Sequence, residues 1–235
     1  YQTQKKSVYL KTENPYLWDI QVLGIVNFNM KSILVCGVGA IGSNFAAYLA
    51  SDVRDAHEIT VLDKDKVEER NIRAGTQFYL QEQIGIPKVE ALQFNIYKFY
   101  NRQVEIIHKE FGCKDANNYR PSDIKNFNLV IDCFDNHSAR SWVQYGWIEG
   151  GPVDVLHIGF SDQFTFAIEW AENYEAPEDN PKARDICELS GASSFVHMVA
   201  AISSSVIQEY LTTGKKKEFC GNRFSLTGKS RRSII

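Results

Sequence analysis

The chain has 235 residues, of which 44% are hydrophobic and 23% are charged, a composition typical of a folded globular domain. The formal net charge of −3 provides no overall positive field for nucleic acid, and no apolar run is long enough to span a membrane. The five cysteines are odd in number and scattered, so we expect no disulfide framework and no zinc site of paired cysteines, and we expect a cytoplasmic protein.

Residues 1–30 precede the first clear strand. The turn-forming pair Asn14-Pro15 is followed by apolar residues between Tyr16 and Val26 at a spacing loosely consistent with an amphipathic helix. We expect this segment either to cap the domain or to meet a partner subunit.

The next stretch reads as strand, tight turn and helix. The apolar run 33–36 leads into the glycine motif 37–42, helical spacing continues over 43–50, and a second apolar run, 59–62, ends in Asp63. This is the fingerprint of a dinucleotide-binding fold, in which glycines make the turn and admit phosphate, and the acidic residue binds ribose hydroxyls. The helix N-terminus adds unpaired N–H groups that favour phosphate. A glycine turn that only packs is the alternative for this motif taken alone.

Strands and helices continue to alternate along the chain. We expect, in order, a polar loop at 64–73, a helix at 88–100, a strand at 103–108, a polar linker at 114–128 with a short helix near 121–125, and a strand at 129–133. This alternation predicts an α/β fold, a Rossmann-like doubly wound, mostly parallel sheet with helices on both faces. Ligands of such sheets bind outside the carboxyl ends of the strands, where Asp63 and Asp135 are both placed.

The last third of the chain is predicted to complete the same domain, 31–235. We expect strands at 153–158 and 163–168, a long acidic loop that begins at 171, and a helix at 193–211. A long loop in a compact domain is often functional. The basic stretches 214–219 and 228–233 are expected to be a solvated face or a frayed tail.

Four motifs in register resemble a known family. They are GVGAIGS (37–43), DKDKVEERNI (63–72), IGIPKVEAL (84–92) and IDCFDNHSAR (131–140), and they resemble the consecutive motifs of the ThiF/MoeB and ubiquitin-activating enzyme superfamily. The resemblance implies an adenylyltransferase that uses ATP and Mg²⁺. Its substrate would be the C-terminal carboxylate of a small ubiquitin-like or sulfur-carrier protein, usually with a Gly-Gly tail. The resemblance also implies a homodimer.

The resemblance assigns roles to residues of each motif. Asp63 would bind ribose, although the neighbouring Asp65 could do so instead, and Asp135 would hold Mg²⁺. Asn71 and Arg73 would contact phosphates, and Lys88 would be a cation beside them. Also implied in nucleotide binding are Gly37, Gly39, Ala40, Gly42 and Asn136, and Asn136 with Arg140 would shape the Asp135 loop. The chemistry agrees with these roles. A carboxylate that attacks a phosphate brings two anions together, so the protein must supply positive charge rather than a nucleophile of its own. Outside this context, Lys88 would be a solvated surface lysine and Asp135-Asn136 a turn.

The sequence also departs from the family pattern. The common Asn-Leu-x-Arg-Gln-Phe is interrupted here, since Ala74-Gly75-Thr76 separates Asn71-Ile72-Arg73 from Gln77. Dimeric relatives contribute an arginine from the N-terminal segment of the neighbouring subunit, but no arginine stands before Lys31 in this sequence. Either a lysine such as Lys11 takes the place of that arginine or no residue does. The paired CxxC motifs of many relatives are absent, so no zinc is expected.

Cys187 is the candidate acceptor within a crossover loop at about 171–192, which in the family embraces the tail of the carrier. A thiol at this position could attack an acyl adenylate, because a thiolate is a competent nucleophile. The alternative is a cysteine buried before the last helix, where His197 is expected to pack or to lie on the surface.

Two other functions remain open from the sequence. One is an adenylating enzyme with a peptide or a tRNA acceptor, although the acidic balance disfavours tRNA. The other is a catalytically inactive nucleotide-binding interaction module. An NAD-dependent dehydrogenase is disfavoured because nothing in the chain resembles a separate substrate domain.

Overall fold

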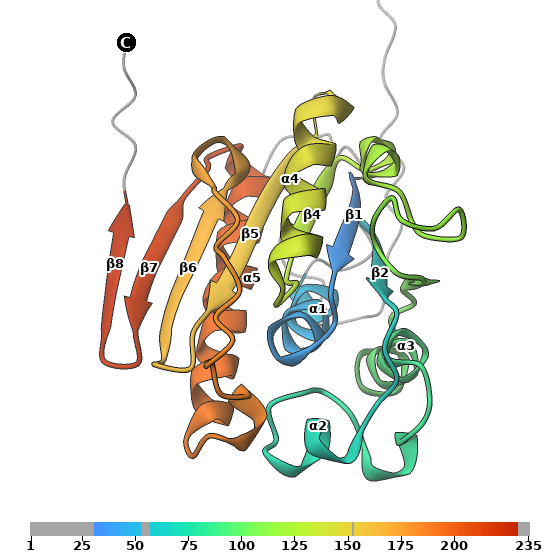
Figure 1. The fold of residues 1–235 in the computed structure, drawn as a ribbon, viewed down its shortest axis with the longest axis vertical. Coiled ribbons are helices and arrows are strands. Elements are labelled where there is room, and N and C mark those ends of the chain that lie inside the picture. Colours follow the sequence, from blue (N-terminus) through green and yellow to red (C-terminus); the bar gives the residue numbers. More distant parts are fainter. Residues whose placement is uncertain (1–30, 53–56, 152, 230–235) are drawn as a thin grey trace, which may run out of the picture.

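The computed structural model describes residues 31–52, 57–151 and 153–229, so the helix expected between Tyr16 and Val26 lies outside the described residues. The described strands form one sheet in the order β3-β2-β1-β4-β5-β6-β7-β8 (Figure 1). The strands are β1 (Lys31–Cys36), β2 (His57–Asp63), β3 (Glu105–His108), β4 (Leu129–Asp132), β5 (Asp154–Phe160), β6 (Thr165–Trp170), β7 (Glu218–Asn222) and β8 (Ser225–Lys229). Strands β1 to β5 pair in parallel, and β6, β7 and β8 extend the sheet in antiparallel fashion.

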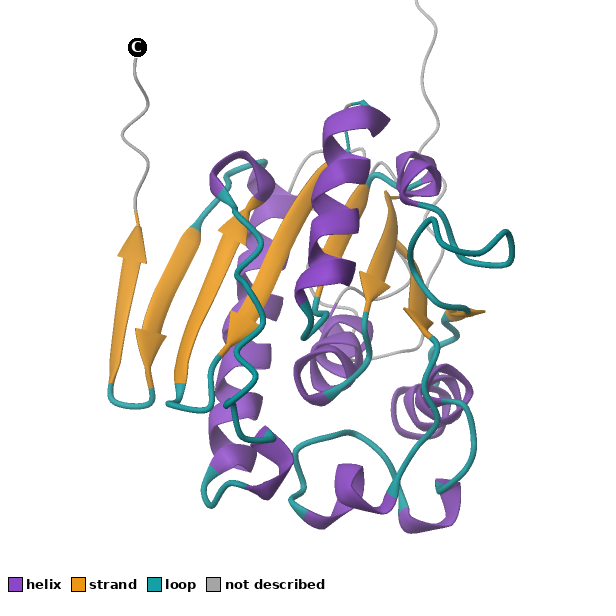
Figure 2. Ribbon diagram, in the orientation of Figure 1, coloured by secondary structure: helices purple, strands orange, loops and turns teal. Residues whose placement is uncertain are grey.

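Helices cover both faces of the sheet (Figure 2). Helix α4 lies in front of the sheet in this view, and the long α5 lies behind it (Figure 1). The helices are α1 (Ala40–Asp52), α2 (Glu69–Arg73), α3 (Lys88–Tyr100), α4 (His137–Gly150) and α5 (Ala192–Thr213), with short 3₁₀ helices η2 (Gln81–Gln83), η3 (Pro121–Asn126), η4 (Ala171–Asn173) and η5 (Ile186–Glu188). This arrangement confirms the predicted Rossmann-like α/β class.

The central strand β1 shows why its sequence is a continuous apolar run. Ile33 and Val35 point into the core formed with α1, α3 and α5, whereas Leu34 and Cys36 point into the core beneath α4 and η3. All four side chains are fully buried. Successive residues of a strand face opposite sides, so a strand covered by helices on both faces needs apolar residues at every position.

Several boundaries differ from those expected. Helix α3 has the predicted bounds, but α1 begins at Ala40, inside the glycine motif. The polar segment predicted as a loop contains the short helix α2, and the supposed C-terminal tail forms the hairpin β7–β8. Short helices also occur within the predicted crossover loop.

The parallel strands place the candidate residues at one edge of the sheet. The glycine motif follows β1, Asp63 ends β2, and Asp135 follows β4, which neighbours β1. No helix among the described residues is long and apolar enough to cross a membrane.

Candidate functional site

The glycine loop connects the carboxyl end of β1 to α1. Gly37 has a φ of +79°, a conformation that glycine adopts at little cost, and its N–H donates to Leu62 O at 2.8 Å. A Cβ on Gly42 would lie 1.9 Å from Gly37 O, so α1 packs against the loop more closely than a side chain allows. At Gly39 a Cβ would meet nothing within 4 Å, so the loop is open to an approaching ligand at that point.

Asp63 fastens this loop to the end of β2. Its Oδ2 accepts from Val38 N and its Oδ1 from Asp65 N, both at 2.8 Å, and only 7% of the residue is exposed. Burial raises the pKa of this carboxyl, while the charge of Lys88 and the two N–H donors oppose that rise. Asp63, the residue predicted to bind ribose, therefore organises the loop without any ligand. Each of its carboxylate oxygens keeps a further lone pair that can accept from a ribose hydroxyl.

Lys88 and Asp65 form an ion pair beside Asp63. The distance from Lys88 Nζ to Asp65 Oδ2 is 3.3 Å, and the side chain of Lys88 is 9% exposed against 53% for Asp65. The main chain adds a second link, because Lys88 N donates to Asp65 O at 2.8 Å. Lys88 is therefore a fixed, nearly buried cation at the start of α3. This geometry excludes the alternative that Lys88 is a solvated surface lysine. Asp65 remains the more accessible of the two carboxylates.

The loop is also held from its other side, by residues to which no motif in the sequence assigns a role. Tyr79 Oη donates to Val38 O at 2.6 Å, and burial raises the pKa of this phenol, which keeps it a donor. Ser43 Oγ donates to Gly39 O at 2.7 Å and accepts from Phe78 N at 3.1 Å. Phe78 and Tyr79 lie in the segment after Arg73, where no local pattern indicates a role, whereas Ser43 ends the glycine motif itself.

Asn71 stabilises α2. Its Oδ1 accepts from Glu68 N at 2.8 Å, which completes a capping box, and the residue is buried. Ala40, another predicted nucleotide neighbour, is the first residue of α1, and its carbonyl accepts from Asn44 Nδ2 at 2.8 Å.

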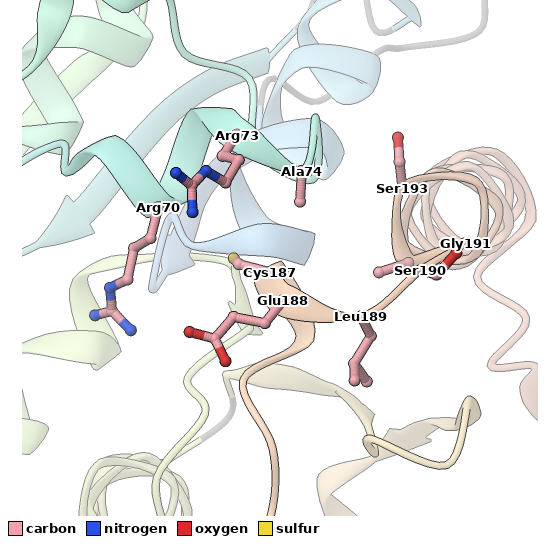
Figure 3. Close-up of a pocket in the computed structure, with 10 residues that line it drawn as sticks. Arg70, Arg73, Ala74, Cys187, Glu188, Leu189, Ser190, Gly191 and Ser193 are labelled. Carbon is pink, nitrogen blue, oxygen red and sulfur yellow. The ribbon is translucent and has the colours of Figure 1, made fainter.

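Arg73 lies with Cys187 on a pocket of about 580 Å³ between α2, η5 and the start of α5 (Figure 3). The side chain of Arg73 is exposed and makes no ion pair within the described residues. Arg70, on the same wall, pairs with Glu68 at 2.5 Å and with Asp185 at 2.7 Å. The predicted phosphate ligand and the predicted acceptor thiol thus share one pocket, whose lining residues do not include those of the glycine loop.

The thiol of Cys187 is held in hydrogen bonds and is only slightly exposed. Its Sγ lies 3.2 Å from Thr76 Oγ1 and 3.4 Å from Gln77 Nε2, and its N–H donates to Asp185 Oδ1 at 2.9 Å. Burial raises the pKa of the thiol, an effect that the hydrogen bonds from Thr76 and Gln77 partly oppose. The resting group is therefore a thiol, and no histidine contacts it in the part of the chain that the structure describes.

Asp135 projects into solvent from the loop between β4 and α4. Asn136 caps α4, since its Oδ1 accepts from Ala139 N at 2.9 Å, and its Nδ2 lies 3.5 Å from Asp135 Oδ1. Arg140 is buried and donates to Ile158 O at 3.1 Å. The two residues therefore shape the Asp135 loop by capping and by anchoring the first turn of α4.

The residues present fit a nucleotide with Mg²⁺ better than a free metal ion. No group of three metal-ligating side chains occurs among the described residues. Mg²⁺ is often held by one or two carboxylates together with substrate phosphates, and Asp135 can supply such a carboxylate. The open face of Gly39 lies in the neighbouring loop, because a Cβ on Gly37 would meet Phe134 and Cys133, next to Asp135, at 3.0–3.1 Å.

Comparison with known proteins identifies the family. The family model described as ThiF family matches residues 17–233. The chain belongs to the ThiF family. This membership confirms the resemblance of the four motifs, and the match also spans the predicted crossover loop and the β7–β8 hairpin.

Curated relatives are similar over about half of this chain. The adenylyltransferase and sulfurtransferase MOCS3 of Aedes aegypti is 28% identical over 124 residues, which cover 53% of this chain and 27% of that protein. The adenylyltransferase and sulfurtransferase UBA4 of Yarrowia lipolytica is 29% identical over 119 residues, 51% of this chain and 28% of that protein. The matched part therefore spans only about a quarter of the length of these relatives.

Solved structures share the fold. A structure of E. coli MccB with ATP has a TM-score of 0.61 at 14% identity and covers 88% of this chain and 65% of that chain. MccB with AMPCPP and MccA has a TM-score of 0.62 at 13% identity, covering 88% of this chain and 66% of that chain. Identities this low support the Rossmann-like fold alone.

Proposed function

We propose that this ThiF-family chain adenylates the C-terminal carboxylate of a small ubiquitin-like or sulfur-carrier protein, using ATP and Mg²⁺. One observation carries the proposal: Asp63 holds the glycine loop next to the nearly buried cation of Lys88, and the face of Gly39 in that loop is open. The names of the MOCS3 and UBA4 relatives, adenylyltransferase and sulfurtransferase, support the reaction class.

The reaction joins a carboxylate oxygen to the α-phosphorus of ATP and releases pyrophosphate. Both reactants are anionic, so the protein must hold positive charge and N–H donors where they meet. Lys88 supplies a cation whose position is fixed by Asp65 and by the first turn of α3. The N-terminus of α1 supplies N–H donors, and Asp63 and Asp65 supply acceptors for ribose hydroxyls.

Asp135 is the residue that would hold the metal. Bound Mg²⁺ would neutralise phosphate oxygens and assist the departure of pyrophosphate. Asn136 and Arg140 keep the Asp135 loop in place by capping and anchoring α4. Arg73 lies on the Cys187 pocket and would contact phosphate groups only at that side of the site.

A second step to Cys187 is part of the proposal. The thiol would attack the acyl carbonyl of the adenylate, form a thioester and release AMP, after losing its proton to a base. Burial raises the pKa of the Cys187 thiol, so this step requires that base to accept the proton as the acyl carbonyl is attacked. We expect Cys187→Ser to retain adenylation and to lose the thioester; a hydroxylamine-resistant wild-type adduct, or a thioester on the serine variant, would exclude this step.

The Gly-Gly tail, the homodimer and the cytoplasmic location belong to the same proposal. A reducing compartment would keep Cys187 available as a thiol. Equilibrium sedimentation of the purified chain with and without ATP tests the homodimer.

The experiment that tests the function is ATP–pyrophosphate exchange with Mg²⁺, with and without small proteins that end in Gly-Gly. We expect exchange that depends on the carrier tail. Asp135→Ala should reduce exchange by about a hundredfold or more, because one preorganised electrostatic group contributes that much. The matched control, Asp115→Ala, removes an exposed aspartate outside the site and should retain exchange. ATP binding without exchange for any carrier tail, including peptides, would instead indicate an inactive binding module.

A further inference from the structure

A buried polar cluster lies beneath the start of the crossover segment, defined here as residues 174–184. In Figure 1 this segment, in orange, passes in front of the sheet beside α4. Its first residue, Tyr174, is buried and stacks in parallel on His157, with ring centroids 3.6 Å apart and an interplanar angle of 6°. Tyr174 Oη also accepts from Arg140 Nη1 at 2.9 Å. The root of the segment is therefore attached by both the face and the hydroxyl of one ring.

His157 is itself fixed on both ring nitrogens. Nδ1 lies 2.7 Å from Asp132 Oδ2 and Nε2 lies 3.1 Å from Gln144 Oε1, while the ring is 1% exposed. The amide of Gln144 cannot reverse freely, because its Nε2 donates to Ala171 O at 3.1 Å. Both ring nitrogens of His157 thus have hydrogen-bond partners, which fix the orientation of the ring. The stacking of this ring on Tyr174 adds contact between two buried aromatic rings.

The same cluster reaches the residues on either side of Asp135. On one side, Phe134 N donates to Asp132 Oδ1 at 3.0 Å. On the other side, His137 N donates to Asp179 Oδ1 at 2.7 Å, and His137 Nδ1 lies 3.0 Å from Pro177 O. The crossover segment is thus attached to α4 directly at its middle and through His157 and Asp132 at its root. Asp135 lies between the two attachments.

We propose that His157 and Tyr174 are positioning residues that hold the crossover segment across the Asp135 loop. The family resemblance implies that a loop at this place embraces the tail of the carrier, so this anchoring would fix the path of the tail to the nucleotide. The kinetic part of this inference rests on the proposed adenylation. The anchoring itself does not, because the contacts join parts of one chain. The residues act through the segment and touch no reacting atom.

Limited digestion with trypsin tests the anchoring without any substrate. Lys182 and Arg184 are exposed cleavage sites inside the segment. A less firmly held segment opens more often, so we expect Tyr174→Leu to be cleaved there at least about tenfold faster than the wild type. Tyr174→Phe keeps the stacked ring and should restore most of the protection. The control Tyr145→Leu removes an exposed tyrosine of α4 and should be cleaved at the wild-type rate.

A second variant covers the case in which Tyr174→Leu fails to fold. Asp179→Ala removes an exposed side chain that holds the middle of the segment, and it should also accelerate cleavage at Lys182 and Arg184. If folded Tyr174→Leu is cleaved at the wild-type rate, the anchoring is overturned. If Tyr174→Leu does not fold, cleavage of Asp179→Ala at the wild-type rate would overturn it instead.

Steady-state exchange kinetics test the guiding role. We expect Tyr174→Leu to raise the KM for the carrier at least about tenfold while the KM for ATP stays within about twofold, because the Asp135 loop keeps its hydrogen bond from Phe134 N to Asp132. Equal rises in both KM values would overturn that role. If the wild type shows no exchange with any carrier, the proposed function fails, and digestion still decides whether the cluster anchors the segment.

Discussion

Replacing Gly42 by alanine should destabilise the fold, whereas the same change at Gly39 should mainly weaken nucleotide binding. At Gly42 the added Cβ would lie 1.9 Å from Gly37 O, 1.1 Å inside the 3.0 Å below which real Cβ contacts essentially never occur. The atom in the way belongs to the backbone, so no rotamer change relieves the clash. Helix α1 must shift away from the loop, with loss of packing for the fully buried Phe45 and Leu49.

The magnitude follows from two opposing effects. Alanine in a helix is favoured over glycine by about 1 kcal/mol. Overpacking of a close-packed interior costs roughly 1–3 kcal/mol and occasionally more, and a backbone clash of this depth belongs to the upper end. We expect a net loss of about 2 kcal/mol, which corresponds to a fall in Tm of roughly 4–8 °C for a chain of this size.

Gly39 provides the matched control. A Cβ at this position meets nothing within 4 Å, so the fold should lose no more than about 1 kcal/mol through poorer helix capping. ATP that approaches the loop backbone at this point would meet the new methyl group, and its Kd should rise at least about tenfold. Thermal unfolding and ATP titration of both variants measure these effects. A Tm of Gly42→Ala equal to that of the wild type, or unchanged ATP binding by Gly39→Ala, would refute the reasoning.

Three further outcomes follow from the charges and burial of the site. Lys88→Met keeps the buried stem but removes the cation, so exchange should fall about a hundredfold with little change in Tm; an unchanged exchange rate would contradict its role. Burial both shields Cys187 and raises its pKa, so iodoacetamide at pH 8 should modify the exposed Cys113 at least about tenfold faster than Cys187. Mass spectrometry of the ligand-free protein measures both rates, and equal rates would show that Cys187 is activated. Burial alone would raise the pKa of Asp132, but the hydrogen bond from His157 and the charge of Arg140 together outweigh burial and lower it. The Asp132 carboxylate therefore contributes to the stability of the fold above about pH 4, and this contribution is lost as the pH falls through the native pKa. The difference in unfolding free energy between the wild type and Asp132→Asn should therefore narrow in urea titrations from pH 7 to pH 3, and a constant difference would show that Asp132 is not held as an anion.

The nucleotide half of the fold was predictable because its signals are local. Pro87 before α3 and the left-handed Asn101 after it give that helix the bounds that its sequence predicts. Helix α2 was missed because five residues are too short for a periodic pattern, and its capping depends on a side chain of Asn71 that the sequence analysis assigned to phosphate.

The β7–β8 hairpin was missed for a different reason. Its sequence is basic and polar, and its strands are stabilised by pairing with β6, a neighbour that is distant in sequence. The signal that could have found it is Asn222, whose Oδ1 accepts from Phe224 N and Ser225 N at 2.9 and 3.0 Å in a two-residue turn.

The buried cluster of His157 and Tyr174 was beyond the sequence analysis because its members come from separate elements. One residue could have signalled it. Asp132 stands within the apolar run 129–133, and a carboxylate in a buried strand requires partners, since an isolated buried charge is very unfavourable. The partners themselves, 25 residues away for His157, depend on the pairing of β4 with β5.

The glycine loop and the Asp135 loop contact each other where the neighbouring strands β1 and β4 end. A Cβ on Gly37 would already touch Phe134 and Cys133, so the glycine loop and the Asp135 loop are in close contact. Asp63 fixes the first loop to β2, and Asp132 fixes the second loop to His157 and, through Tyr174, to the crossover segment. Adenylation requires the nucleotide, the metal and the carrier carboxylate to keep one geometry, and misplacement by about 1 Å can lower a rate a hundredfold. A chain that fixes each of these loops through a buried aspartate can maintain that geometry while Asp135 and Gly39 remain accessible to ligands.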